Sequence, residues 1–289
     1  MKKYVLYNPI AGSGMSESAA SSLASVYPEC EIIKMDITEI KNYGNFLSLA
    51  KNEDIILCGG DGTLNRFINA IKNIEFDNDV LYLPTGNGND FANDVGQANA
   101  TKPFSIKKYI TDLPTVTVNG REYSFINGIG YGIDGYCCEV GDKLRAEGKK
   151  PNYTAIAIKG LLFHYKPTSA TVIVDGVEKR YKKVWIAPAM HGRYYGGGMI
   201  PTPDQDRNNA DKKLSLMVFH GSGKLRTLMI FPSIFKGEHV KQTKHVEVIT
   251  GKNITVKFDS PRALQIDGET ILDVTEYSVA VAKKPVSIS

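Results

Sequence analysis

The sequence lacks the long apolar segments that are typical of membrane and secreted proteins. Among its 289 residues no stretch is apolar enough to span a bilayer, and Lys159 interrupts the most apolar one, residues 155–163. The apolar run near the start is too short for a signal peptide. The four cysteines have no metal-ligand spacing, and two of them are neighbours, which rarely bridge: Cys30, Cys58, Cys137 and Cys138. We expect a soluble, cytoplasmic protein of a reducing compartment, without structural zinc.

Several common functional motifs are also missing. The net charge is only +4 and no Lys/Arg-rich run exists, which argues against nucleic acid but suits phosphates or an anionic membrane surface. A Walker A loop would need an earlier glycine and a Ser or Thr after Gly223-Lys224, where Leu225 stands instead. The five histidines form no nucleophile or metal constellation. Any chemistry must therefore come from other residues.

One stretch does combine a buried strand, a glycine-rich turn and a helix. Residues 55–58 are apolar and rich in branched side chains, and the apolar positions after Thr63 have the spacing of a helix face. The turn between them is Gly-Gly-Asp-Gly-Thr, and a phosphate fits at such a turn because the helix directs unpaired N–H groups toward it. Gly-Gly alone would indicate only a tight βα loop. Asp61 would repel a phosphate unless a cation bridged them, so the turn predicts a magnesium nucleotide.

The order of the expected elements predicts two domains. Strands alternate with helices up to residue 83, and three strands end in Gly/Asn-rich turns, which favours a doubly wound α/β nucleotide-binding domain over residues 1–114. From residue 115 the hairpin signals Asn119-Gly120, Asp175-Gly176 and Gly251-Lys252 separate alternating strands. Residues 115–289 should form a mostly antiparallel β domain, whose last strand is free to return to the first domain. We assign the run Gly130-x-Gly132-x-x-Gly135 to tight packing within it.

The turn around Asp61 resembles the signature of the diacylglycerol kinase catalytic-domain family, which is related to sphingosine kinases and, more distantly, to NAD kinases. Asn8-Pro9 with Gly12 is similar to its first nucleotide loop, and Pro84-x-Gly86-x-x-Asn89-Asp90-Phe91-Ala92 is similar to a further motif. The resemblance implies nucleotide contacts from Asn8, Pro9, Gly12, Gly59, Gly60, Asp61, Gly62, Thr63, Asn65, Gly86, Asn87, Asn89 and Asp90.

Two stretches of the second half extend the resemblance. Gly196-Gly197-Gly198-Met199 and the acidic loop of residues 204–211 resemble a region that carries a structural magnesium, which implies Asn208, Asp211 and the Lys213 carbonyl as ligands. A solvated acidic loop is the alternative. Gln265-Ile266-Asp267-Gly268-Glu269 resembles the stretch that holds the catalytic base, which implies Asp267 or Glu269 beside Asp61 as catalytic residues. For Asp267-Gly268 the alternative is a plain hairpin turn.

The chain departs from the family pattern at four positions. Arg66 stands where Glu is frequent, Asn87 where Thr is frequent, Asn93 where Arg is frequent, and Lys212 where Gly is usual. The lost hydroxyl and the changed charges would alter the nucleotide geometry and, most of all, the structural magnesium site.

The resemblance implies an ATP- and Mg²⁺-dependent lipid kinase with an NAD kinase/diacylglycerol kinase-like fold. Its acceptor would be a lipid alcohol presented by the β-rich domain across a cleft, first of all diacylglycerol, which would give phosphatidate for phospholipid biosynthesis. An NAD kinase is the rival enzyme, and a non-catalytic nucleotide- or lipid-sensing module is the rival of another class. The Asn-Asp-Phe-Ala and Asp-Gly-Glu stretches favour the lipid kinase.

A lipid kinase must reach its substrate at a membrane. Apolar residues between Lys224 and Lys236 could rest in a membrane interface, as part of a transient peripheral contact on the inner face. A core helix is the favoured reading of that segment. The sequence leaves a homodimer open.

Overall fold

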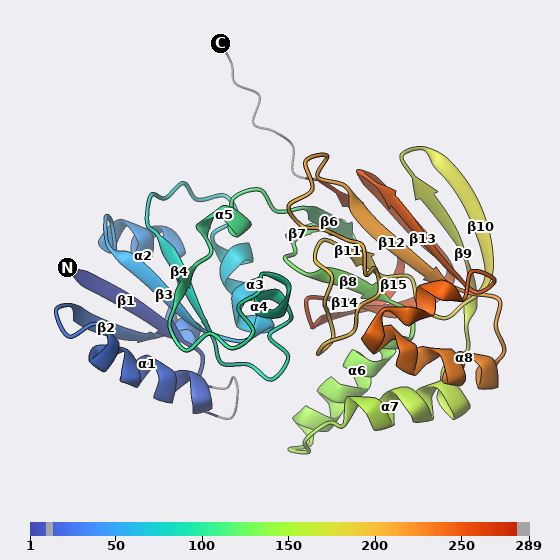
Figure 1. The fold of residues 1–289 in the computed structure, drawn as a ribbon, viewed down its shortest axis with the longest axis horizontal. Coiled ribbons are helices and arrows are strands. Elements are labelled where there is room, and N and C mark those ends of the chain that lie inside the picture. The colour runs from blue at the N-terminus through green and yellow to red at the C-terminus, as the bar shows by residue number, and fades with distance from the viewer. Residues whose placement is uncertain (10–13, 282–289) are drawn as a thin grey trace, which may run out of the picture. The chain divides into compact units, whose positions relative to one another are not determined.

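The computed structural model describes residues 1–9 and 14–281, and these divide into two compact units between Leu113 and Pro114, called unit 1 and unit 2. Each unit has a sheet of its own (Figure 1). Within the described residues no helix is long and apolar enough to cross a membrane. Gly12, which was predicted to contact the nucleotide, lies outside the described residues.

Unit 1 is a sheet of five strands with helices on both faces. The strand order is β2-β1-β3-β4-β5, in which the first four strands are parallel and β5 is antiparallel. The order reverses direction between β1 and β3, which is where ligands bind in sheets of this kind. The elements are β1 (Lys2–Tyr7), α1 (Met15–Val26), β2 (Glu31–Asp36), η2 (Ile37–Glu39), α2 (Tyr43–Leu49), β3 (Asp54–Gly59), α3 (Asp61–Ala70), β4 (Val80–Pro84), α4 (Asp90–Asp94), β5 (Phe104–Ser105) and α5 (Lys107–Ile110).

Alternation along the strands of unit 1 divides its core between the two faces. Val5 and Ile56 pack with Leu23 of α1 in one buried cluster. On the other face Tyr4 meets Phe46 of α2, with ring centroids 5.7 Å apart. Burial on both faces explains why the strands are almost continuously apolar, as is typical of parallel sheets.

Unit 2 is mainly antiparallel. Its strand order is β13-β12-β11-β8-β14-β15-β6-β7, and the β9–β10 hairpin joins through β14. The elements are β6 (Thr115–Val118), β7 (Arg121–Ser124), β8 (Gly128–Tyr131), α6 (Ile133–Ala146), α7 (Tyr153–Lys159), η3 (Gly160–His164), β9 (Thr168–Val174), β10 (Val177–Val184), β11 (Ala189–Met190), β12 (Leu214–Phe219), α8 (Lys224–Ile230), η4 (Phe231–Lys236), η5 (Glu238–Lys241), β13 (Val246–Gly251), β14 (Asn253–Ile266) and β15 (Glu269–Ala280). This α/β plus antiparallel β architecture is the predicted fold class.

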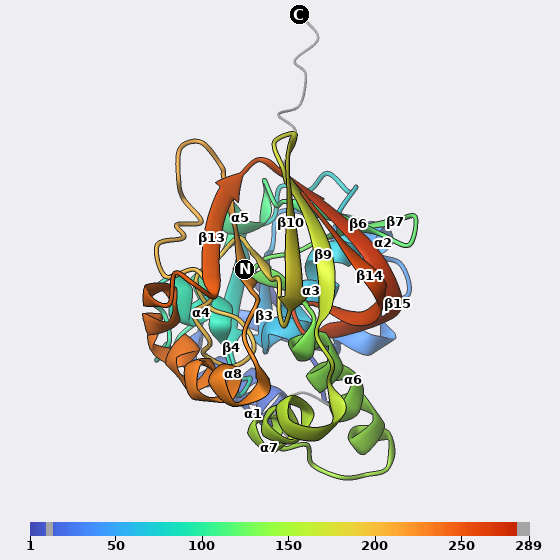
Figure 2. The same cartoon turned by 90° about the vertical axis from the view of Figure 1, so that its right-hand side faces the viewer.

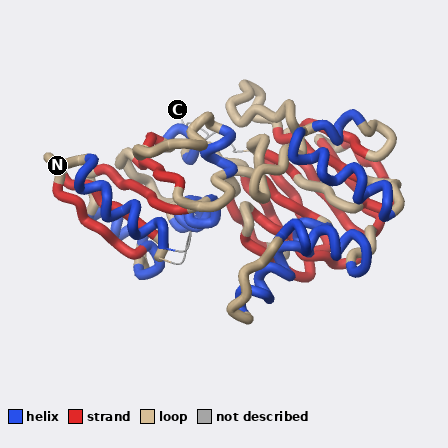
Figure 3. The backbone as a smooth tube through the Cα atoms, turned by 60° about the horizontal axis from the view of Figure 1, so that its bottom comes forward, coloured by secondary structure: helices blue, strands red, loops and turns tan. Residues whose placement is uncertain are grey.

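The helices of unit 2 lie together over one side of its strands (Figure 3). A second buried cluster fills the space between them and the sheet, and it includes Leu161, Trp185 and Ile230. The main cluster lies among the strands themselves. Two of the predicted hairpin turns are present, because Asn119-Gly120 and Asp175-Gly176 both adopt positive φ at their two central residues.

The third predicted hairpin was wrong. Gly251-Lys252 joins β13 to β14, but β13 pairs with β12, and β14 pairs with β15, β9 and β8. A glycine at the end of an alternating strand is compatible with any sharp change of direction, so the local signal could not identify the partner strand. Strand β15 pairs with β14 and β6 of unit 2.

The glycine run after β8 serves tight packing, as predicted. A Cβ on Gly132 would lie 2.4 Å from the Trp185 carbonyl oxygen, and one on Gly135 would lie 2.0 Å from the carbonyl oxygen of Ala263. These distances leave no space for a side chain, so helix α6 can approach β14 only through glycine.

Candidate active site

The loops that follow β3 and β4 touch backbone to backbone at the carboxyl edge of the unit 1 sheet. A Cβ on Gly86 would lie 2.6 Å from the Cα of Gly60, and one on Gly60 would lie 3.1 Å from the Cα of Gly86. The Thr85 N–H also donates to the Gly59 carbonyl (2.9 Å). Two turns that were predicted from separate motifs are therefore one surface, as expected for neighbouring parallel strands.

Asp61 ties these two loops together. Its two carboxylate oxygens accept the backbone N–H groups of Asp90 and Phe91, each at 2.9 Å, so Asp61 caps helix α4 from the neighbouring loop. The Asp61 side chain thus has a structural role in addition to any contact with a cation.

The β4–α4 loop is held in shape by its asparagines. Asn89 adopts a left-handed backbone conformation (φ 49°), and its amide both accepts from the Gly86 N–H (3.0 Å) and donates to the Gly86 carbonyl (2.9 Å). Asn93 donates to the Gly88 carbonyl (3.0 Å). Asn89 therefore positions the loop through its side chain, and Asn93 fixes the next turn.

The first strand contributes to the same edge. Asn8 follows β1, and its Nδ2 donates to Thr63 Oγ1 in the first turn of α3 (3.3 Å). Gly59 makes room for Thr63, because a Cβ on Gly59 would lie 2.5 Å from the Thr63 Cβ. The predicted residues Asn8, Gly59, Gly60, Asp61, Thr63, Gly86, Asn89 and Asp90 are thus brought together by the described contacts.

Sequence reasoning missed two hydroxyl groups at this edge. Ser16, at the start of α1, and Thr85, after β4, share a hydrogen bond of 2.8 Å between their side-chain oxygens. Both stand beside glycine-rich turns that the sequence analysis did identify. A Ser or Thr near a glycine-rich turn is the sequence signal that could have identified each residue. Their hydrogen bond could not be predicted, because the two residues are 69 positions apart in the sequence.

In unit 2, Asp267 is buried and heavily hydrogen-bonded. Its carboxylate accepts the N–H groups of Ile126 (2.7 Å), Asn127 (2.9 Å) and Gly128 (2.9 Å), while its own N–H donates to the Gly128 carbonyl (3.1 Å). Asp267 and Gly268 both have positive φ and form the two-residue turn between β14 and β15. Asp267 is therefore part of a hairpin turn, and its side chain also anchors the start of β8. Glu269, at the start of β15, is exposed.

The loop of residues 204–213 contains Asn208, Asp211 and Lys213, which the resemblance implies as ligands of a second cation. The Lys213 carbonyl oxygen already accepts two side-chain amides, Gln205 Nε2 (3.1 Å) and Asn209 Nδ2 (2.9 Å). Asp211 is exposed and forms an ion pair with Lys213 Nζ (3.3 Å). Among the described residues no group of three or more His, Cys, Asp or Glu side chains could hold a metal ion.

A buried carboxylate that the sequence analysis did not single out lies at the start of α6. Asp134 is 7% exposed, and neither of its oxygens makes a hydrogen bond of normal geometry within the described part of the chain. Its polar neighbours are the side chains of Gln265 and Tyr195. Burial raises the pKa of Asp134 to about 6. A Cβ on Gly130 would lie 1.3 Å from Asp134 Oδ2, so the carboxylate occupies space that a glycine leaves open.

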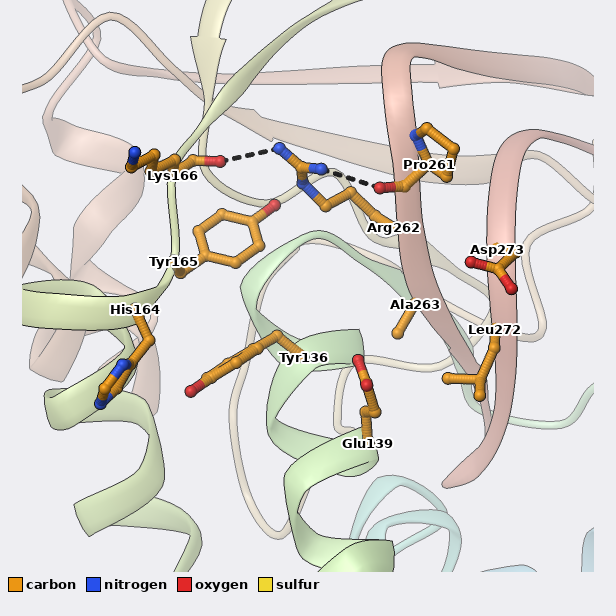
Figure 4. Close-up of a pocket in the computed structure, with 10 residues that line it drawn as sticks. All are labelled: Tyr136, Glu139, His164, Tyr165, Lys166, Pro261, Arg262, Ala263, Leu272 and Asp273. Atoms are coloured by element: carbon orange, nitrogen blue, oxygen red, sulfur yellow. Dashed lines mark hydrogen bonds between the residues drawn. The ribbon is translucent and has the colours of Figure 1, made fainter.

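Unit 2 also contains a pocket of about 350 Å³ beside α6 (Figure 4). It is lined by Tyr136, Glu139, His164, Tyr165, Lys166, Pro261, Arg262, Ala263, Leu272 and Asp273. The Arg262 guanidinium donates to the carbonyls of Pro261 (2.8 Å) and Lys166 (3.0 Å) and lies 5.6 Å from the Tyr165 ring centre. The arginine thus closes one wall of the pocket, and no motif in the sequence predicted it.

Comparison with known proteins covers nearly the whole chain. A model of the "Diacylglycerol kinase catalytic domain" matches residues 2–115, and a model of the "YegS C-terminal NAD kinase beta sandwich-like domain" matches residues 127–286. A curated protein of Mycobacterium tuberculosis (strain H37Rv) named diacylglycerol kinase is 25% identical over 274 residues, which cover 90% of this chain and 85% of that protein.

A solved structure has the same fold. The crystal structure of a diacylglycerol kinase from Bacillus anthracis superposes with a TM-score of 0.60 at 18% identity, covering 98% of this chain and 94% of the other.

Proposed function

Since the chain belongs to the diacylglycerol kinase-like family of lipid kinases, we propose that it transfers the γ-phosphoryl group of ATP to the hydroxyl of a lipid alcohol, with diacylglycerol as the first candidate acceptor. In this reaction the bond between the γ-phosphorus and the bridging oxygen breaks while a bond to the lipid oxygen forms. ADP leaves with the electron pair, and the hydroxyl proton passes to a base. Diacylglycerol would give phosphatidate.

The observation that carries the proposal is the position of Asp61. Its carboxylate is fixed by two N–H groups of α4 while it stands in the first turn of α3, whose N-terminus favours anions. A carboxylate and phosphate oxygens close together require a cation between them, and Mg²⁺ prefers such oxygen ligands. Bound magnesium would neutralise charge on the phosphates. Because Gly60 and Gly86 lack a Cβ, the two loops that would face the nucleotide can approach each other closely.

We propose Asp267 or Glu269 of unit 2 as the group that accepts the proton. Three backbone donors hold the Asp267 carboxylate in one orientation, which suits a base that must be positioned but also stabilises its anion. Asp267 is buried whereas Glu269 is exposed, so mutation can separate the contributions of the two residues.

The test is ATP-dependent labelling of diacylglycerol in mixed micelles with magnesium, with NAD as a parallel acceptor. We expect label in the lipid, and a loss of at least about 100-fold in Asp61→Asn, which removes a charge at the phosphates but keeps the side-chain shape. Asp79→Asn is the matched control, because Asp79 precedes β4 and its carboxylate accepts a surface hydroxyl, that of Ser105 (2.8 Å).

The other outcomes identify the rivals. Label in NAD and none in lipid would assign the protein to NAD kinase activity. A protein that binds ATP but transfers phosphate to neither acceptor, and whose ATP binding is the same in Asp267→Asn, would favour a sensing module. Loss of labelling in Asp79→Asn as large as in Asp61→Asn would mean that the effect is one of stability.

A further inference from the structure

Two helical segments of unit 2 expose large apolar side chains. The first consists of α7 and η3, and the second consists of α8 and η4. Phe163 and Leu225 are each 72% exposed, and Met229 is 66% exposed. Ile158 and Phe235 are exposed as well. We call these five side chains the apolar patch.

The patch is separate from the packing that holds the helices in place. Ile156 and Leu161 of the first segment, and Ile230 and Ile234 of the second, are buried in the cluster between the helices and the sheet. Both segments are therefore apolar on their inner side and again on part of their outer side. A core helix, the reading favoured from sequence, explains only the inner residues.

The two segments are neighbours on the surface. Lys224 at the start of α8 donates from Nζ to the Leu162 carbonyl of η3 (2.7 Å), and α8 packs against η3. Figures 1 and 2 both draw α7 and α8 at the same end of unit 2. The exposed apolar groups of the two segments thus contribute to one surface.

The two segments that carry the patch contain charge of a single sign. Residues 152–166 and 223–237 contain no Asp or Glu, and they carry five basic residues: Lys159, Lys166, Lys224, Arg226 and Lys236. All five are exposed, and none of them forms an ion pair with a carboxylate of the described chain. These cations are available to a partner that is rich in negative charge.

We propose that the apolar patch and its basic rim dock unit 2 on an anionic phospholipid bilayer, with Phe163, Leu225 and Met229 in the interface. The proposal deepens the proposed function and rests on it, because a lipid acceptor resides in a bilayer. Apolar side chains that enter the acyl boundary, surrounded by Lys and Arg that contact anionic headgroups, are the combination that binds such interfaces. The exposed apolar groups alone would suit a protein partner equally well, and the five basic residues of the two segments, which contain no acidic residue, favour the bilayer.

The first test is co-sedimentation with phosphatidylglycerol/phosphatidylcholine vesicles, which requires no turnover. Replacing Phe163, Leu225 and Met229 together by Ser should weaken binding at least about tenfold, with cooperative unfolding retained because all three are exposed. The matched control is Leu49→Ser with Val177→Ser, two apolar positions that are equally exposed elsewhere (70% and 73%). Unchanged vesicle binding by the folded triple variant would overturn the proposal.

A second set of variants tests the charge. Lys159→Gln, Arg226→Gln and Lys236→Gln together should reduce binding to phosphatidylglycerol vesicles at least about tenfold, and added salt should do the same to the wild type. The control replaces three exposed lysines of unit 1, Lys51, Lys102 and Lys108, by Gln. Equal losses in the two triple variants would mean that only net charge matters, which would overturn the assignment to this surface.

A third measurement does not depend on loss of binding. Phe163→Trp adds an exposed indole to a protein whose single natural tryptophan, Trp185, is buried. Its emission should shift to the blue on anionic vesicles. Binding of this variant to vesicles without a shift in emission would overturn the proposal. The proposal would also fail if the wild type is a dimer, and the Ser triple variant is a monomer that still binds vesicles.

The failure of this inference can be told apart from failure of the proposed function. With a short-chain diacylglycerol dispersed in detergent, the Ser triple variant should keep its activity within about twofold, while its activity on vesicle-embedded substrate falls about tenfold. If neither the wild type nor the Ser triple variant phosphorylates any lipid, but the wild type binds vesicles more tightly than the variant, the kinase proposal fails and the docking surface is supported.

Discussion

The backbones of Gly60 and Gly86 are in close contact, and a Cβ on Gly86 would lie 2.6 Å from the Cα of Gly60. The two glycines belong to loops after neighbouring strands, and their contact fixes the distance between the N-termini of α3 and α4. The nucleotide site proposed at this edge depends on that contact, because both loops supply its backbone.

Gly86→Ala should therefore separate the two loops. Overpacking of this kind costs about 1–3 kcal/mol, so we expect the free energy of unfolding to fall by about 2 kcal/mol and the KM for ATP to rise at least about tenfold. Urea unfolding and initial-rate kinetics measure the two effects. Gly223→Ala is the control, since its Cβ would meet nothing within 4 Å, and its effect should stay within about 0.5 kcal/mol. Normal stability and KM in the Gly86→Ala protein would contradict the tight contact.

Asp267 and Glu269 should differ in what their removal does to stability. Asp267→Asn disturbs three N–H donors that converge on one buried carboxylate, and we expect a loss of about 2 kcal/mol. Glu269→Gln changes an exposed side chain and should cost less than about 0.5 kcal/mol. Kinase rates measured well below both melting temperatures then identify the base, which is the residue whose loss abolishes kcat in a folded protein. A stable Asp267→Asn protein would show that the three hydrogen bonds contribute little.

Asp134 should make the protein less stable as the pH rises. Its pKa is raised from 3.8 to about 6, so the native state holds the proton more tightly than the unfolded chain does. This carboxyl therefore imposes no penalty below pH 4, and an increasing one between pH 4 and 6. Above pH 6 the penalty is constant at about 3 kcal/mol.

Asp134→Asn, which is neutral at every pH, should be the more stable protein at pH 7.5, and its advantage should vanish toward pH 4. Urea unfolding followed by Trp185 fluorescence gives the comparison. Asp142→Asn on the same helix serves as control, because Asp142 is an exposed partner of Arg145. An advantage of Asp134→Asn that does not change with pH would rule out titration of this carboxyl as its cause.

Removal of divalent cations should leave the loop of residues 204–213 intact. The Lys213 carbonyl is satisfied by Gln205 and Asn209, so dialysis against EDTA should shift the melting temperature by less than about 1 °C. Asn209→Ala removes three hydrogen bonds and should cost about 2 kcal/mol, whereas Asn208→Ala should be nearly neutral. If Mg²⁺ strongly raises the melting temperature of the wild type but not of Asp211→Ala, the cation site predicted from sequence would be supported.

The parts of the fold that could be predicted from sequence are those with local signals. Continuous apolar strands, the Gly-Gly-Asp-Gly-Thr turn and the Asn119-Gly120 hairpin each specify their conformation within a few residues. The partner of β13 could not be predicted, because pairing depends on strands far away in the sequence. For the same reason the sequence did not reveal the contact between Ser16 and Thr85 or the donors around Asp267.

The candidate site shows the same limit. Sequence patterns identified Asp61 as a residue near phosphates, but its two hydrogen bonds to α4 follow from the parallel pairing of β3 and β4. Asp134 escaped notice because an isolated acidic residue in a helix is usually solvated, and only burial makes it exceptional.

The position of β15 in its sheet has a consequence for synthesis on the ribosome. Strand β6, at residues 115–118, pairs with residues 277–280 of β15, and β8 pairs with the end of β14. Unit 2 can thus complete its sheet only after residue 280 has left the exit tunnel, whereas every strand of unit 1 finds its partners within the first 113 residues. The emerging polypeptide carries a folded α/β unit followed by a long segment that is not yet folded. The apolar strands of unit 2 are exposed during this time, and chaperones that bind nascent chains would contact them there.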